Sequence, residues 1–153
     1  MGERYVVAEG TSSEGFTWVV WARRHEPQQG DLLSLIRVTD SGGRILHAGA
    51  AGGAPLNPGH VIKVSTGGSE EGPRALLARV HPSVRRVQLR AQDGTTTEVP
   101  IYDCPAFPEV RFASMLLPRD LALDSVAAFG AKDAELERFD LRFQQGRWEA
   151  RRR

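Results

Sequence analysis

Cysteine is almost absent from this chain of 153 residues, because Cys104 is the only one. A single cysteine cannot close an intrachain disulfide, which excludes the disulfide frameworks of small secreted domains. No apolar run approaches the roughly 18–20 residues that cross a membrane, and residues 1–5 lack the apolar core of a signal peptide. We therefore expect no membrane span and a cytoplasmic location.

Lysine and asparagine are also scarce. Of the 20 basic residues 18 are arginine, the lysines are Lys63 and Lys132, and Asn57 is the single asparagine. Arginine enrichment fits either the codon usage of a GC-rich genome, which we favour, or bidentate recognition of phosphate and carboxylate groups. The arginines are interleaved with 19 acidic residues and the net charge is +1, so the one-sided basic surface of a nucleic-acid binder is not expected.

The composition is that of one ordinary globular domain. Hydrophobic residues make up 41% of the chain and charged residues 25%. A chain of this length buries about 68–70% of its unfolded surface, so it needs neither a disulfide nor a metal in order to fold. We expect a single domain over residues 1–145, followed by a basic C-terminal tail at 146–153.

Period-two alternation broken by Gly, Pro and Asp clusters is the commonest pattern in the chain, and it is typical of half-buried strands. It predicts an all-β fold, a two-sheet antiparallel β-sandwich of about nine to eleven strands, immunoglobulin-like or jelly-roll-like. No long amphipathic helix competes with this interpretation. The predicted strands cover residues 5–8, 16–23, 32–39, 44–48, 61–66, 76–81, 86–91, 95–101, 110–117, 121–129 and 136–143.

One hairpin can be predicted in register. A three-residue loop at 92–94, with Gly94 in the left-handed region, sets Val87 opposite Val99 and places Gln88 beside Glu98 on the wet face. A two-residue loop would instead put Glu98 on the apolar face. Pro100 cannot donate a ladder hydrogen bond, so its strand lies at an edge or ends there.

The segment 16–22 carries apolar residues on both faces, which predicts a central or covered strand. Phe16 and Trp18 point one way and Trp21 points the other. Trp18 is interpreted as a core residue. For Trp21 the pattern favours a core position and an exposed binding platform about equally.

The C-terminal region is ambiguous between two periods. Phe139, Leu141 and Phe143 alternate with charged residues as in a strand, while Leu136, Phe139 and Phe143 also fit helical spacing. We favour the strand.

No catalytic motif is present, and we expect neither an enzyme nor a cofactor. The glycine-rich stretch 49–59 lacks a Lys-Ser/Thr ending and a G-x-G-x-x-G pattern, so it is interpreted as a connector. Cys104 follows an acidic residue and stands before Pro105, which does not favour a thiolate nucleophile. The four histidines are dispersed, so no metal site is expected.

Several stretches together resemble uncharacterised β-sandwich domains of high-GC bacteria. The similar residues are Ala8-Glu9-Gly10-Thr11, Phe16–Val20, Arg79–Leu89, Asp93-Gly94, Glu98–Ile101 and Val126–Gly130, about two thirds of the chain. Such domains often carry a cysteine pair in their first half, which is missing here, and this fits a reducing compartment. The resemblance brings no catalytic residues.

These observations favour a non-enzymatic protein–protein interaction module, or a structural or regulatory component of a bacterial assembly. The expected partner is another protein, because Arg and aromatic residues are enriched at binding hot spots. The alternative is a carbohydrate-type ligand binder that uses Trp21 or Tyr102 as a stacking platform. The candidate contact residues are Trp21, Arg86, Arg90, Arg111 and Trp148.

Overall fold

The computed structural model describes residues 3–24 and 30–152. Twelve strands are followed by one C-terminal helix, with a short 3-10 turn (Ala131–Asp133) before the last strand. The strands are β1 (Tyr5–Thr11), β2 (Thr17–Arg24), β3 (Leu32–Thr39), β4 (Ile45–Ala51), β5 (Ile62–Gly67), β6 (Arg74–Val80), β7 (Arg86–Ala91), β8 (Thr96–Val99), β9 (Ile101–Tyr102), β10 (Arg111–Leu117), β11 (Leu123–Phe129) and β12 (Glu135–Asp140), and the helix is α1 (Arg142–Arg152).

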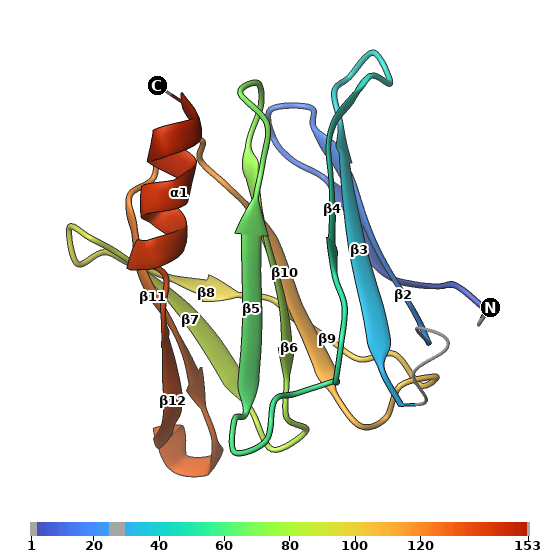
Figure 1. The fold of residues 1–153 in the computed structure, drawn as a ribbon, viewed down its shortest axis with the longest axis vertical. Helices are drawn as coiled ribbons and strands as arrows, with labels where there is room; N and C mark the ends of the chain where they lie inside the picture. Colours follow the sequence, from blue (N-terminus) through green and yellow to red (C-terminus); the bar gives the residue numbers. More distant parts are fainter. Residues whose placement is uncertain (1–2, 25–29, 153) are drawn as a thin grey trace.

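The strands form three antiparallel sheets of four strands each. Sheet A has the order β1-β2-β3-β4, sheet B the order β5-β6-β10-β9 and sheet C the order β12-β11-β7-β8. Figure 1 shows sheet B between the other two. The all-β antiparallel prediction is confirmed, but the count of two sheets is wrong, because sheet B is a middle layer that both outer sheets cover.

The middle layer is clearest at β6, where all seven residues are buried. Leu76, Ala78 and Val80 face sheet C, while Ala75 and Leu77 face sheet A. The strand also carries Arg74 and Arg79, both buried, and these charges hide its continuous burial from a reading of hydropathy alone. A strand covered on both faces needs apolar residues at successive positions, which β6 supplies between its two arginines.

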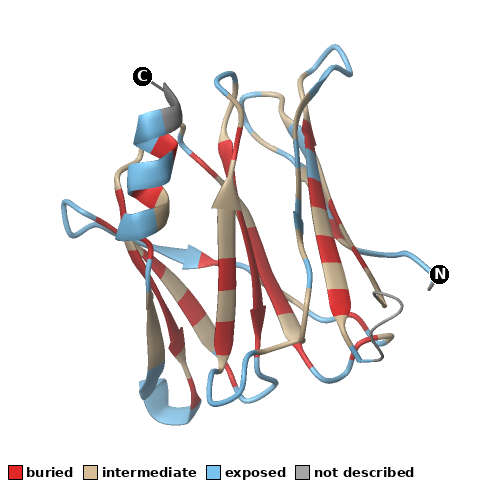
Figure 2. Ribbon diagram, viewed as in Figure 1, coloured by how far each residue is buried: buried red, intermediate tan, exposed pale blue. Residues whose placement is uncertain are grey.

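Two separate cores hold the layers together. The larger one lies between sheets B and C and includes Leu76, Val87 and Val126. The other lies between sheets A and B, where Val20 and Ile36 pack against Leu77, with a neighbouring group around Phe107 and Phe112. Figure 2 shows the resulting alternation of buried and half-buried bands along β3.

The predicted hairpin register is confirmed. Val87 pairs with Val99 and Gln88 with Glu98, and Gly94 has a φ of 91°. Pro100 then ends β8, the edge strand of sheet C, and β9 continues at the edge of sheet B. The expected single strand at 95–101 is therefore two short strands, because a proline at the corner lets the chain change sheets.

The C-terminus differs from the prediction. The strand β12 ends at Asp140, and α1 contains residues 146–152, which were expected to form a polar tail. The helix docks through two buried residues, Leu141 just before its start and Trp148 on its inner side, although most of its surface is polar and exposed. Figure 2 shows this division between its inner and outer sides. Within the described residues, no helix is long and apolar enough to cross a membrane.

Candidate binding face on sheet A

The five predicted contact residues lie in separate parts of the molecule. Trp21 is on sheet A, Arg86 and Arg90 are on β7 in sheet C, Arg111 is on β10 in sheet B, and Trp148 is on α1. The structure therefore does not bring them together in one site. Their surroundings decide which of them a partner can contact.

Arg86 and Arg90 point outward from sheet C, but both are engaged by carboxylates. Arg86 donates to Glu98 at 2.5 Å and to Asp133 at 2.6 Å. Arg90 donates to Asp124 at 3.0 Å. The outer face of sheet C is therefore largely self-neutralised, and it does not offer a free basic patch.

Arg111 and Trp148 are occupied in other ways. The Nε and Nη2 groups of Arg111 donate to Asp103 at 2.8 and 3.2 Å, and this pairing lowers the pKa of Asp103. Trp148 is only 4% exposed, and the guanidinium of Arg74 lies 4.8 Å from its ring centroid. Trp148 thus anchors α1 and is not available as a surface platform.

Trp21 has a different environment, on the face of sheet A that points away from sheet B. The strand register aligns Val6, Trp21, Leu35 and Ala50 side by side across β1, β2, β3 and β4. Trp21 and Leu35 are half-buried, Ala50 is exposed and Val6 is 53% exposed. An apolar row therefore crosses the whole sheet on its solvent side, and we call this surface the outer face of sheet A.

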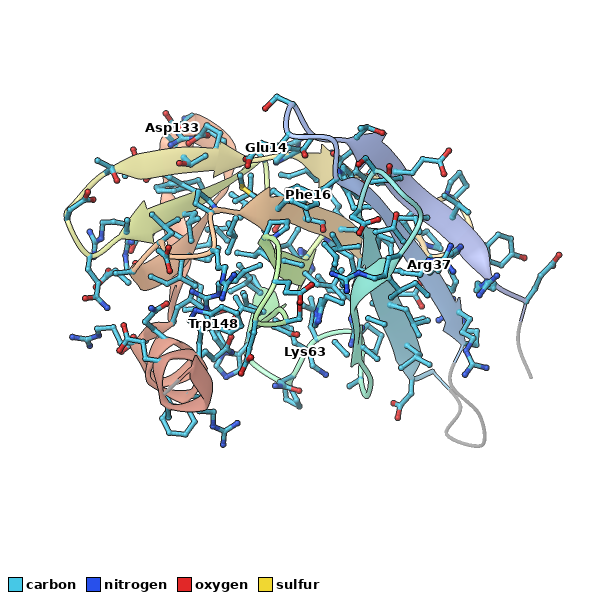
Figure 3. All side chains as sticks on the ribbon, turned by 90° about the horizontal axis from the view of Figure 1, so that it is seen from above. Glu14, Phe16, Arg37, Lys63, Asp133 and Trp148 are labelled. Atoms are coloured by element: carbon cyan, nitrogen blue, oxygen red, sulfur yellow. The ribbon has the colours of Figure 1, made fainter. Side chains whose placement is uncertain are left out.

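Two arginines cover the indole of Trp21. The Cζ atom of Arg4 lies 4.6 Å from the ring centroid and that of Arg37 lies 4.9 Å from it. Both arginines are exposed residues, and Arg37 is labelled in Figure 3. Cation–π contacts of this kind hold a guanidinium in place without neutralising its charge. The outer face of sheet A therefore presents two oriented positive groups beside apolar surface.

The local sequence explains this arrangement. Along β3, the residues facing sheet B (Leu32, Ser34, Ile36 and Val38) are all buried, so the alternate positions, which include Leu35 and Arg37, point to solvent. Arg37 pairs with Val19, two residues along β2 from Trp21 and on the same face of the sheet. This placement puts a long side chain within reach of the neighbouring aromatic ring.

Sequence reasoning identified Trp21 but missed Arg4, Val6 and Arg37. The strand predicted at 32–39 places Leu35 and Arg37 on one face, and this spacing is the signal that could have marked them. The contact of Arg4 with Trp21 depends on the β1–β2 register, which is shifted by an irregularity between Val6 and Ala8. No sequence signal marks that shift.

The described residues contain no grouped set of metal ligands, and their single cysteine lies in the core. No three His, Cys, Asp or Glu side chains there are grouped to hold a metal ion. His25 falls outside the described ranges. Cys104 is buried, next to the Phe107 cluster, and behaves as a small core residue.

Comparisons with known proteins give no relative from which the function of this chain could be inferred. No protein-family model matches the sequence, and neither curated proteins nor solved structures give a significant match.

Proposed function

We propose that this protein is a non-enzymatic binding module and that the outer face of sheet A docks an extended, acidic segment of another protein. The observation that carries the proposal is the apolar row centred on Trp21, with the guanidinium groups of Arg4 and Arg37 over the indole. Tryptophan and arginine are the residues most enriched at interface hot spots.

Charge decides the class of partner. The described part of this face carries Arg4 and Arg37 over the indole against a single acid, Glu9, so these groups leave an excess of positive charge. The arginines of sheet C, by contrast, are paired with acids of the same sheet or the turn beside it. Complementary charge across an interface favours an acidic partner and excludes a basic one.

The shape of the surface favours an extended segment. The row from Val6 to Ala50 runs across four neighbouring strands, which lie about 4.8 Å apart. A segment with alternating apolar and acidic residues matches this row and its flanking arginines. The carbohydrate alternative lacks such support, because Arg4 and Arg37 occupy space over the ring on which a sugar would stack.

A synthetic peptide of alternating Glu and Leu, titrated calorimetrically, tests the proposal. Trp21→Ala is expected to weaken binding about thirtyfold, which corresponds to a hot-spot loss of about 2 kcal/mol. Arg37→Gln is expected to weaken binding less and to reduce its dependence on salt. Arg90→Gln, a matched loss of one charge on sheet C, is expected to leave the affinity unchanged.

Three results would count against the proposal. The first is equal binding of the peptide in which every Glu is replaced by Lys. The second is an affinity that Trp21→Ala does not change. The third is self-association of the protein in sedimentation that Trp21→Ala abolishes, because that result would assign the face to a second copy of the chain.

A further inference from the structure

A hollow away from the outer face of sheet A opens where the β1–β2 turn, the β5–β6 loop and the end of β10 meet. Its volume is about 480 Å³, and the lining includes Ser12, Glu14, Phe16, Leu116 and Arg119. Ligand pockets for small molecules commonly measure about 300–1,000 Å³. Figure 3 views the molecule from this end and labels Glu14 and Phe16.

Arg119 is the unusual member of this lining. It is half-buried, and its Nε atom is covered yet has no hydrogen-bond partner among the described residues. A guanidinium shielded from water normally gains a carboxylate or carbonyl acceptor, as Arg111 and Arg79 do. Arg119 has neither in the described part of the chain, so its positive charge lacks an internal counterpart.

Glu14 supplies the opposite charge in the same hollow without pairing with Arg119. Its turn is tightly held, because the Phe16 amide donates to Ser12 Oγ at 3.1 Å and the Ser12 amide donates to the Phe16 carbonyl at 2.8 Å. Gly15 adopts the left-handed φ of 90° that the turn requires. Within the described residues Glu14 forms no ion pair. A carboxylate and a guanidinium therefore line the same pocket without pairing with each other.

The same lining also contains apolar side chains. Phe16 is half-buried, Leu116 is half-buried and Leu117 is buried. Gly72 keeps the loop close to this wall, because a Cβ there would lie 2.6 Å from Leu46 Cδ1 and 3.6 Å from Phe16 Cε1. The loop therefore passes over the Phe16 ring with no side chain of its own at this point.

We propose that this pocket binds a small zwitterion of the amino-acid or short-peptide class that carries an apolar side chain. The ligand carboxylate accepts hydrogen bonds from the terminal Nη groups of Arg119, and its ammonium group faces Glu14. Its apolar side chain packs against Phe16 and Leu116. The lining supplies one cation, one anion and apolar side chains, and a zwitterion of this kind complements all three.

Calorimetric titration with three related probes tests this assignment. The probes are L-phenylalanine, N-acetyl-L-phenylalanine, which lacks the positive charge, and L-phenylalaninamide, which lacks the negative charge. L-phenylalanine is expected to bind saturably and about tenfold more tightly than either analogue, since a hydrogen bond to a charged group is worth about 1.5 kcal/mol or more.

The variants make the test specific to each charge. Arg119→Gln is expected to weaken L-phenylalanine about tenfold and to abolish its advantage over the amide. Glu14→Gln is expected to abolish the advantage over the N-acetyl compound. Arg85→Gln is the matched control, because Arg85 is exposed and lines a different hollow. If Arg119→Gln does not fold, Arg119→Lys serves, since it keeps the charge but loses the bidentate fork.

The proposal is overturned by any of three outcomes. These are no saturable binding of L-phenylalanine at millimolar concentration, full discrimination among the probes in folded Arg119→Gln, or equal weakening by Arg85→Gln. Each of these outcomes leaves the outer face of sheet A unaffected, because the two surfaces share no residue.

Discussion

Gly94 is required in the β7–β8 turn because its backbone adopts a positive φ, not because the site lacks space for a side chain. Its φ is 91°, and a Cβ added there would meet nothing within 4 Å. Gly94→Val is therefore expected to destabilise the fold because a β-branched residue resists positive φ, and not because its side chain clashes with a neighbour. The expected loss is about 1–2 kcal/mol or more. Chemical denaturation measures the loss. Gly94→Asn should cost less, because asparagine tolerates positive φ, and equal losses would contradict this account.

Asp140 has the clearest pH response. Hydrogen bonds from the Arg142 side chain and amide lower the pKa of Asp140 to about 2. Because its unfolded pKa is about 3.9, its contribution to stability is complete above about pH 4 and is lost as pH falls through about 2. Arg142→Gln should raise the pKa of Asp140 in an NMR titration. A pKa that stays near 2 in that variant would refute the assigned cause.

Gln145 joins α1 to the two sheets beneath it. Its buried Oε1 accepts from Arg74 Nη1 at 2.7 Å and from the Leu123 amide at 3.2 Å. Gln145→Met keeps the volume but removes an acceptor from a buried cation and a buried amide, so we expect a loss of about 2–3 kcal/mol. The readout is the free energy of unfolding in urea.

The adjacent Gln144 is the matched control for that change. It accepts from the Thr66 amide at 3.1 Å and from the Thr66 hydroxyl at 2.7 Å along the edge of β5, where the surroundings are only half-buried. Water can replace these contacts, so Gln144→Met should cost less than about 1 kcal/mol. Equal losses for the two variants would show that α1 is not docked through Gln145.

At this scale the sequence predicted the strands well and the helix poorly. Each described strand overlaps a predicted segment, although the segment 95–101 contains both β8 and β9, and the 92–94 loop fixed one register. The helix was missed because Phe139 and Leu141 continue the strand pattern up to the point where Asp140 accepts a hydrogen bond from the Arg142 amide. That contact starts a new element without any change in hydropathy.

The molecule as a whole depends on Arg79 for part of the contact between sheets A and B. Its guanidinium donates to Ser34 Oγ at 2.8 Å and to the carbonyls of Ala51, Ala54 and Pro55 at 3.0–3.1 Å. Burial lowers the pKa of Arg79, and the acceptors around the guanidinium offset that loss of water. One side chain thus ties a strand of sheet B to sheet A and to the glycine-rich connector.

Hydrogen exchange of Arg79→Met tests this role. Amides of β3 and β4 should lose protection, because the carbonyls of the connector lose their donor, while amides of β7 and β11 should keep theirs. Uniform loss across all three sheets would instead indicate a global destabilisation. Unchanged exchange in sheet A would show that apolar packing alone holds that layer.

The number of layers and the composition of the candidate site could not be predicted from the sequence, and the reason is the same for both. Both depend on which strands become neighbours, and alternation within a strand does not reveal its partners. Trp21 could be predicted from its own pattern, but Arg4 comes to the indole through a bulged β1–β2 register. Arg86 and Arg90 were predicted as contact residues, but Asp133 and Asp124, which are distant in sequence, pair with them in the folded sheet.

The central claim is that the two outer faces differ, with the outer face of sheet A open to a partner and that of sheet C neutralised by its own acids. NMR shift mapping with the alternating Glu-Leu peptide tests it most directly. The account predicts shifts at the Trp21 indole and at the Nε groups of Arg4 and Arg37, with those of Arg86 and Arg90 unmoved. Shifts centred on Arg86 and Arg90 would contradict it.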